Sequence, residues 1–237
     1  MLKATISSKE GTLMKRRTKL CDRKLPNYCK GEEIMNMVTH IVGGGFAVLA
    51  LILCILKCIG NSNTLATLGS VIYGISMVTL YTMSSVYHGL RPGTAKKVMQ
   101  VIDHCTIYFL IAGTYTPILL TAMRPVYPSI SLGLLIFEWC GAAVAATLTA
   151  IDLKKYNIFS MICYITTGWA ILPFWRQAMD VLQKTGFLLV LYGGIAYTIG
   201  AVLYGIGAKK PWIHSVFHIF VVIGSLLQFF AILLYVL

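Results

Sequence analysis

The chain has 237 residues, of which 57% are hydrophobic and 12% charged, and its formal net charge is +12. An ordinary soluble domain carries about twice that charged fraction, so the composition excludes a soluble fold and indicates an integral membrane protein. Because the apolar runs are long and continuous, the predicted spans are helices of about 20 residues, not the alternating strands of about 10 residues that build membrane barrels.

Seven apolar runs follow one another along the chain, and each is predicted to be one transmembrane helix. Links such as "GNSNT", "LRPGT" and "GAKKPW" separate the runs, and short links make sequential helices antiparallel neighbours. The predicted fold class is therefore all-α, a seven-helix transmembrane bundle in one domain, 39–237. The runs are 39–59, 65–88, 98–122, 127–151, 156–175, 186–208 and 211–237.

The distribution of basic residues predicts the orientation of the bundle. Of the 20 Lys and Arg residues, 16 lie in the segment 1–38 or in links on the same side of the membrane, and four lie on the other side. Cytoplasmic loops retain Lys and Arg, so we expect the amino terminus in the cytoplasm and the carboxyl terminus outside.

The segment 1–38 is a basic tail that holds nine of the Lys and Arg residues. Its polar composition predicts a flexible segment, and because a membrane follows directly, the expected partner is anionic lipid of the inner leaflet. No groove-reading motif supports binding to nucleic acid. The tail is a poor signal peptide, because the first apolar run is too long for an h-region and lacks a small-residue cleavage site.

The histidines form the clearest functional pattern. A single interfacial histidine usually has an ordinary hydrogen-bonded role, but all five in this chain fall at the predicted cytoplasmic ends of helices. Ionisable residues within a membrane are costly and usually face the bundle interior, where they have a function. The five are His40, His88, His104, His214 and His218.

Spacing then predicts a metal site. His214 and His218 are four residues apart, so both project from one helix face and can bind one ion, and His88 lies at matching depth as the expected third ligand. Three imidazoles leave a fourth tetrahedral position open, as in catalytic zinc sites. A ligand set rich in histidine and poor in carboxylates favours zinc over magnesium or calcium, but residue type alone does not exclude copper or iron. Asp103 is expected to hold a water there, and Ser84 lies one turn deeper than His88.

Three stretches, "SSVYHGL", "IDHCTIYFLIAGTYTPILL" and "HSVFHIFVVIGSLLQFFAI", resemble the signatures of the hemolysin III family, the bacterial branch of the progestin and adipoQ receptors. The resemblance extends from residue 36 to the end of the chain. It implies seven helices in a bacterial plasma membrane and a zinc ion near the cytoplasmic face. The implied site residues are the ligands His88, His214 and His218, with Asp103 contacting the ion through water and Ser84 beside it.

Two histidines and one glutamine stand apart from these expected ligands. His40 and His104 match histidines common in the family, and we expect them to support the ligands or to lie at an interface between helices. Gln228 occupies a position where family members often have histidine. It lies about 15 Å beyond His218 along the helix, so its presence should leave the zinc site intact.

The predicted site and the resemblance together give three candidate functions. In the wider superfamily, which includes alkaline ceramidases, the same residue set is associated with amide hydrolysis in lipids. As a hydrolase of lipid amides or esters in membrane lipid homeostasis, the chain would use Asp103 to accept a proton from water and Ser84 or a backbone group to stabilise the developing oxyanion. The alternatives are a sensor of lipid or membrane state with a structural zinc, and a pore-forming cytolysin.

Overall fold

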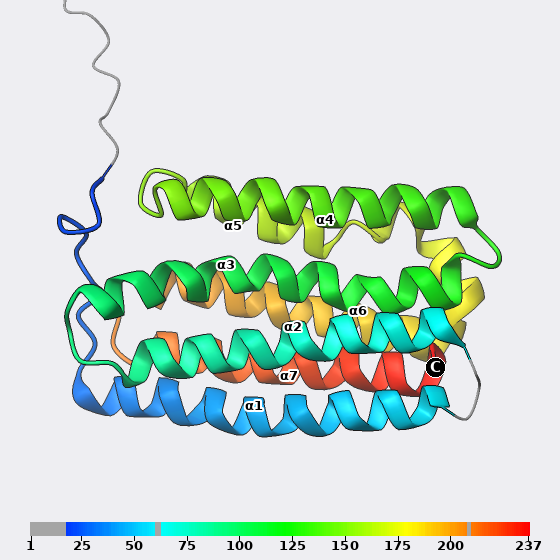
Figure 1. Ribbon diagram of the computed structural model, residues 1–237, viewed down its shortest axis with the longest axis horizontal. Helices are drawn as coiled ribbons and strands as arrows, with labels where there is room; N and C mark the ends of the chain where they lie inside the picture. Colours follow the sequence, from blue (N-terminus) through cyan, green and yellow to red (C-terminus); the bar gives the residue numbers. More distant parts are fainter. Residues whose placement is uncertain (1–17, 60–62, 208–209) are drawn as a thin grey trace, which may run out of the picture.

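The computed structural model describes residues 18–59, 63–207 and 210–237, and within these ranges it contains helices and no strand. Figure 1 shows the helices lying side by side along the long axis of the molecule. Six helical stretches in these ranges are long and apolar enough to cross a membrane, so the prediction of an all-helical membrane protein is confirmed. They are Lys30–Ile59, Thr64–Gly89, Thr94–Met123, Pro128–Ile151, Asn157–Gly207 and Ile213–Tyr235.

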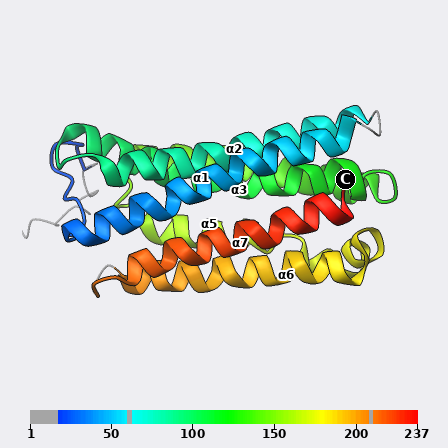
Figure 2. The same ribbon diagram turned by 90° about the horizontal axis from the view of Figure 1, so that it is seen from below.

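The individual elements are labelled α1 to α7, with two short segments η1 and η2 between them. α7 lies between α1 and α6, as Figure 2 shows, and α2 packs against both α1 and α3. The bounds are α1 Lys30–Ile59, α2 Thr64–Gly89, α3 Thr94–Pro117, η1 Ile118–Met123, α4 Pro128–Ile151, α5 Asn157–Gly168, η2 Leu172–Phe174, α6 Trp175–Gly207 and α7 Ile213–Tyr235.

The first helix begins earlier than the apolar run that predicts it. α1 starts at Lys30, so the last part of the predicted tail 1–38 is helical. Glu32 and Glu33 lie in its first turn, where a carboxylate is favourable beside the positive end of the helix dipole. The expectation of a flexible tail concerns mainly residues 1–17, which lie outside the described residues.

The fifth and sixth helices differ from the prediction. Instead of one helix over 156–175, α5 ends at Gly168 and a 3₁₀ turn at Leu172–Phe174 follows, while α6 already begins at Trp175. The 12 residues of α5 extend only about 18 Å, less than the hydrocarbon thickness of about 30 Å. α6 then bends at Gln183, whose backbone is non-helical with φ 59°. Apolar composition predicted one full-length helix and missed this division.

Small residues allow the helices to approach closely. A Cβ added at Gly69 of α2 would lie 2.8 Å from the Cα of Pro117 at the end of α3. Such contacts are typical of membrane helices, whose association depends on packing because lipid is as apolar as the side chains. Pro117 cannot donate a backbone hydrogen bond, and from there the helix continues in the π form as η1.

The distribution of side chains is that of a membrane protein. Large apolar side chains face outward, with Val42 64% and Ile158 76% exposed, whereas polar side chains such as Asn36, Ser84 and Glu138 are buried. The described chain begins and ends at opposite ends of the bundle (Figure 1). The protein is therefore a multi-pass membrane protein that buries polar side chains among the apolar residues of its core.

Candidate functional site

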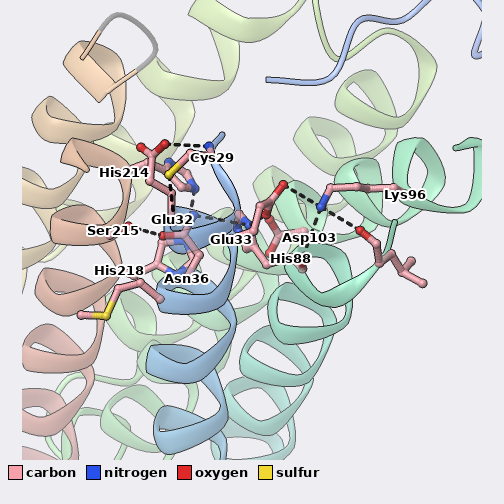
Figure 3. A network of polar contacts seen from close by, with 12 residues as sticks. Cys29, Glu32, Glu33, Asn36, His88, Lys96, Asp103, His214, Ser215 and His218 are labelled. Atoms are coloured by element: carbon pink, nitrogen blue, oxygen red, sulfur yellow. Dashed lines mark hydrogen bonds and ion pairs between the residues drawn. The ribbon is translucent and has the colours of Figure 1, made fainter. Parts of the chain in front are cut away.

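Three histidines meet at the end of the bundle where α1 begins. α2 ends there with His88, and α7 begins there with His214 and His218, so residues far apart in sequence become neighbours (Figure 3). All three side chains are buried, and one ring nitrogen from each lies within 4.8 Å of the others. The Nε2 atoms of His214 and His218 are 3.1 Å apart.

The three imidazoles fit a tetrahedral metal ion. Zinc–nitrogen distances of about 2.1 Å place two ligand nitrogens about 3.4 Å apart. The 3.1 Å between the Nε2 atoms of His214 and His218 is close to that value, and all three ligand nitrogens lie within 4.8 Å of one another. Within the described part of the chain, Nε2 of His88 has no hydrogen-bond partner although it is buried. A buried polar atom without a partner costs free energy, and a cation at the centre of the cluster would relieve that cost.

A carboxylate that the sequence analysis did not single out orients His88. Oε2 of Glu33 lies 2.7 Å from Nδ1 of His88, and because a carboxylate only accepts, Nδ1 carries the proton and donates it. This tautomer leaves Nε2 of His88 unprotonated for a metal. The available signal was an acidic pair just before the first apolar run, at the same end of the helices as the five histidines.

Lys96 completes this arrangement from α3. Its buried Nζ lies 2.7 Å from Oε1 of Glu33 and donates to the backbone oxygens of His88 at 3.3 Å and Leu90 at 3.0 Å. The ammonium group therefore has a partner for each of its three donors. The ion pair fixes Glu33, and through Glu33 the ring of His88, while the backbone contacts hold the end of α2.

Contacts from α1 hold the start of α7, which carries the other two histidines. Ser215 donates through Oγ to Oδ1 of Asn36 at 2.6 Å (Figure 3), and the backbone N–H of Trp212 donates to Oε1 of Glu32 at 2.7 Å. Trp212 has a φ of 65°, a left-handed conformation that is unusual outside glycine. Glu32 thus stabilises a backbone turn that directs His214 into the cluster.

Asp103 and Ser84 line a cavity that reaches two of the three clustered histidines, His214 and His218, from inside the bundle. The cavity has a volume of ≈ 140 Å³, and His40, His214 and His218 share the polar end with Ser84 and Asp103. Its remaining wall is mostly apolar and comes from α2, α3, α5, α6 and α7. The predicted catalytic pair therefore lies on the same cavity as two predicted ligands.

His104 has both ring nitrogens occupied away from the cluster. Nδ1 donates to the backbone oxygen of Gln100 at 2.7 Å, so Nε2 is the acceptor for the hydroxyl of Tyr204 at 2.9 Å. Oδ2 of Asp103 lies 3.9 Å from Nδ1 of His104, which is too far for a hydrogen bond. The contacts of His104 connect α3 to α6.

His40 contacts a candidate ligand directly. Its buried ring stacks on His218 with a centroid separation of 3.8 Å and meets the ring of Tyr81 edge-on at 5.0 Å. Neither nitrogen of His40 has a hydrogen-bond partner among the residues that the structure describes. Gln228 lies farther along the same cavity and donates to the backbone oxygen of Val190 at 3.1 Å.

Comparison with known proteins gives one consistent result. The protein family described as "Haemolysin-III related" matches residues 28–229, a range that includes all five histidines. The chain is 35% identical over 206 residues to Hemolysin-3 of Bacillus cereus, which covers 87% of this chain and 92% of the relative. It is 33% identical over 204 residues to the Hemolysin-3 homolog of Bacillus subtilis (strain 168), with coverages of 86% and 94%. Monocyte to macrophage differentiation factor of Homo sapiens is 27% identical over 170 residues, with coverages of 68% and 67%.

Proposed function

This chain belongs to the haemolysin III family, and from that premise we propose that it is a zinc-dependent hydrolase of lipid amides or esters. One observation carries the proposal. His88, His214 and His218 converge at one end of the bundle, and a largely apolar cavity beside them also holds Asp103 and Ser84. The bacterial relatives support a location in the plasma membrane.

The proposed roles follow from where the side chains lie. His88, His214 and His218 would hold the ion, which supplies Lewis-acid polarisation of a carbonyl and acidifies a water molecule. Asp103 accepts the proton of the attacking water, a general-base role worth about 10²–10⁴-fold in rate. Ser84 donates a hydrogen bond to the substrate carbonyl oxygen as negative charge develops on it.

The cavity indicates the class of substrate. Apart from its polar end, side chains such as Ile107, Leu110, Ile111 and Val221 line it, and these match an acyl chain. A lipid amide or ester could place its carbonyl among the polar residues while its chain occupies the apolar part. Such a substrate would come from the bilayer, which agrees with a role in membrane lipid homeostasis.

We further propose the topology of the bundle. The described chain begins and ends at opposite ends of the bundle, which supports an odd number of passes, with α5 and η2 together as the proposed seventh (Figure 1). The excess of Lys and Arg on the amino-terminal side supports a cytoplasmic amino terminus and an external carboxyl terminus. The histidine cluster then lies near the cytoplasmic face, where the basic tail 1–38 would contact anionic lipid.

A second function, a lipid or membrane-state sensor with a structural zinc, is favoured by the contacts between helices. Glu33 with His88 connects α1 to α2, while Asn36 with Ser215 connects α1 to α7. A metal bound to His88, His214 and His218 would further tie α2 to α7. Such a clamp requires the ligands but not Asp103.

Metal content and hydrolysis together test the proposal. The full-length protein, purified without chelators, is assayed for zinc by elemental mass spectrometry beside His214→Ala and Asp103→Ala. Hydrolysis is followed with palmitoyl 4-nitroanilide and 4-nitrophenyl palmitate. We expect near-stoichiometric zinc in the wild type and in Asp103→Ala, loss of zinc in His214→Ala, and loss of hydrolysis in both variants.

The other outcomes separate the alternatives. Zinc without hydrolysis of any acyl amide or ester would favour the sensor, with metal removal lowering thermal stability. Release of a dye from liposomes by the purified protein would instead support a cytolysin. A wild type without metal, or hydrolysis that survives complete loss of zinc, would overturn the zinc-dependent hydrolase.

A further inference from the structure

A segment before α1 crosses the end of the bundle that holds the histidine cluster. This strap, residues 18–29, contains no regular helix and runs from the level of α4 and α5 to the start of α1 (Figure 1). The backbone N–H of Thr18 donates to Oδ2 of Asp152 at 2.7 Å, and Lys97 donates through Nζ to the backbone oxygen of Cys21 at 2.5 Å. The strap is therefore attached to the α4–α5 link and to α3.

The other end of the strap brings an aromatic ring onto the cluster. Tyr28 stacks on His214, with ring centroids 4.9 Å apart and planes 20° from parallel, and its centroid is 5.9 Å from that of His88. The cavity reaches His214 from within the bundle, whereas Tyr28 contacts it from a segment outside the helices. A tyrosine of an interfacial belt would place its ring among lipid headgroups, so this inward stacking calls for another explanation.

One carboxylate positions both members of this stack. Oε2 of Glu32 accepts from the backbone N–H of Cys29 at 2.9 Å, next to Tyr28, and Oε1 accepts from the backbone N–H of Trp212 at 2.7 Å, two residues before His214. The backbone on either side of the stacked rings is thus fixed to the same side chain. This arrangement sets the ring of Tyr28 over His214 independently of the lipid.

From this geometry we infer that Tyr28 is a further positioning residue of the metal site, and that it controls exchange of metal and water with the aqueous phase. The inference rests on the proposed zinc site. Tyr28 holds the ring of His214 in its ligating orientation and covers the imidazoles from the end of the bundle, while the cavity reaches them from within the bundle. Opening this side of the site requires the strap to move.

The rate of zinc release tests the inference. Zinc-loaded full-length protein in lipid nanodiscs is mixed with excess EDTA, and the zinc retained is measured at intervals after rapid desalting. Removal of the ring in Tyr28→Ala should speed release by about tenfold or more, whereas Tyr28→Phe, which keeps the stacking ring, should stay close to the wild type. Tyr127→Ala, at the α3–α4 link, is the matched control and should also release zinc at the wild-type rate.

A variant remote from the cluster distinguishes solvent access to the metal site from the packing of Tyr28 on His214. Asp152→Asn weakens the far attachment of the strap without touching any histidine, so it should speed release by less than Tyr28→Ala and leave equilibrium zinc content unchanged. It also keeps the inference testable if Tyr28→Ala fails to fold. Fully loaded Tyr28→Ala and Asp152→Asn with wild-type release rates would overturn the inference alone. A wild type that never binds zinc would overturn both the inference and the proposed function.

Discussion

Glu33 on α1 and His88 on α2 meet at 2.7 Å between Oε2 and Nδ1, and this contact determines which nitrogen of His88 faces the cluster. Because Nδ1 donates its proton to the carboxylate, Nε2 is unprotonated and its lone pair is available to a metal ion. Lys96 holds the other oxygen of Glu33 at 2.7 Å, so the carboxylate cannot easily turn away. A residue outside the predicted site thus sets the chemistry of a predicted ligand.

Glu33→Ala should weaken zinc binding by about 10–100-fold, because His88 loses the acceptor that fixes its tautomer and ring orientation. The measurement is competition for zinc with a chelator of known affinity. Glu33→Gln, which still offers an oxygen to Nδ1, should show a smaller loss. Asp180→Asn is a control, since Asp180 accepts from Tyr127 in contacts remote from the histidines. Equal affinities for Glu33→Ala and wild type would contradict the role given to Glu33.

His104→Leu should keep zinc but destabilise the bundle. The substitution removes the ring bond to the oxygen of Gln100 and leaves the buried hydroxyl of Tyr204 without its acceptor, which lowers the free energy of unfolding by about 1–3 kcal/mol. Zinc content and unfolding in mixed micelles are measured on the same samples. Tyr204→Phe should reproduce part of the destabilisation. Loss of zinc from a folded His104→Leu protein would show that His104 is closer to a ligand than its contacts indicate.

A larger side chain in the cavity should discriminate between substrates by chain length. Ala201 of α6 lines the cavity, so Ala201→Phe would occupy space that a long acyl chain needs. Hydrolysis of 4-nitrophenyl palmitate should fall by about tenfold or more, while 4-nitrophenyl butyrate should be less affected. Ala143→Phe, on an exposed face of α4, is the matched control. An equal loss for both esters would argue against an acyl chain in this cavity.

The attachment of the strap to Asp152 should make the stability of the protein depend on pH. Desolvation alone would raise the pKa of the Asp152 carboxyl, but hydrogen bonds from the backbone N–H groups of Thr18, Lys155 and Lys154 lower it below its usual value. A carboxyl whose pKa is lower in the folded than in the unfolded state contributes stability at pH values above its unfolded-state pKa. This contribution disappears as the pH falls through the folded-state pKa.

The melting temperature of the wild type should therefore exceed that of Asp152→Asn near neutral pH by about 2–4 °C. A change of roughly 1 kcal/mol in the free energy of unfolding produces such a shift in a protein of this length. The difference should shrink as the pH falls below the usual aspartate range. Melting is followed in detergent at a series of pH values, with Asp22→Asn, an exposed aspartate of the strap, as the control. A difference that stays constant down to strongly acidic pH would exclude the carboxylate as its source.

Much of the fold could be predicted because lipid imposes strong constraints on sequence. The length of the apolar runs alone identified α1 to α4 and α7, and most of the predicted helix ends lie within a few residues of the observed ones. This works because a helix in hydrocarbon must form all its backbone hydrogen bonds internally and must span a fixed thickness. The same signal failed for 156–175, where composition stays apolar although the helix stops at Gly168. It also missed the polar first turns of α1, which lie outside the apolar run and are stabilised by Glu32 and Glu33.

For the site, helical periodicity and depth are local properties, so the sequence by itself placed five histidines at one end of the bundle and put His214 and His218 on one helix face. Only the tertiary structure decided which of them meet. It brings His88 to that pair, turns His104 toward Tyr204, stacks His40 on His218, and adds Glu33, Lys96 and Tyr28. Those contacts join residues from different helices and from the strap, and they depend on how the helices pack against one another, which no pattern within one segment of sequence records.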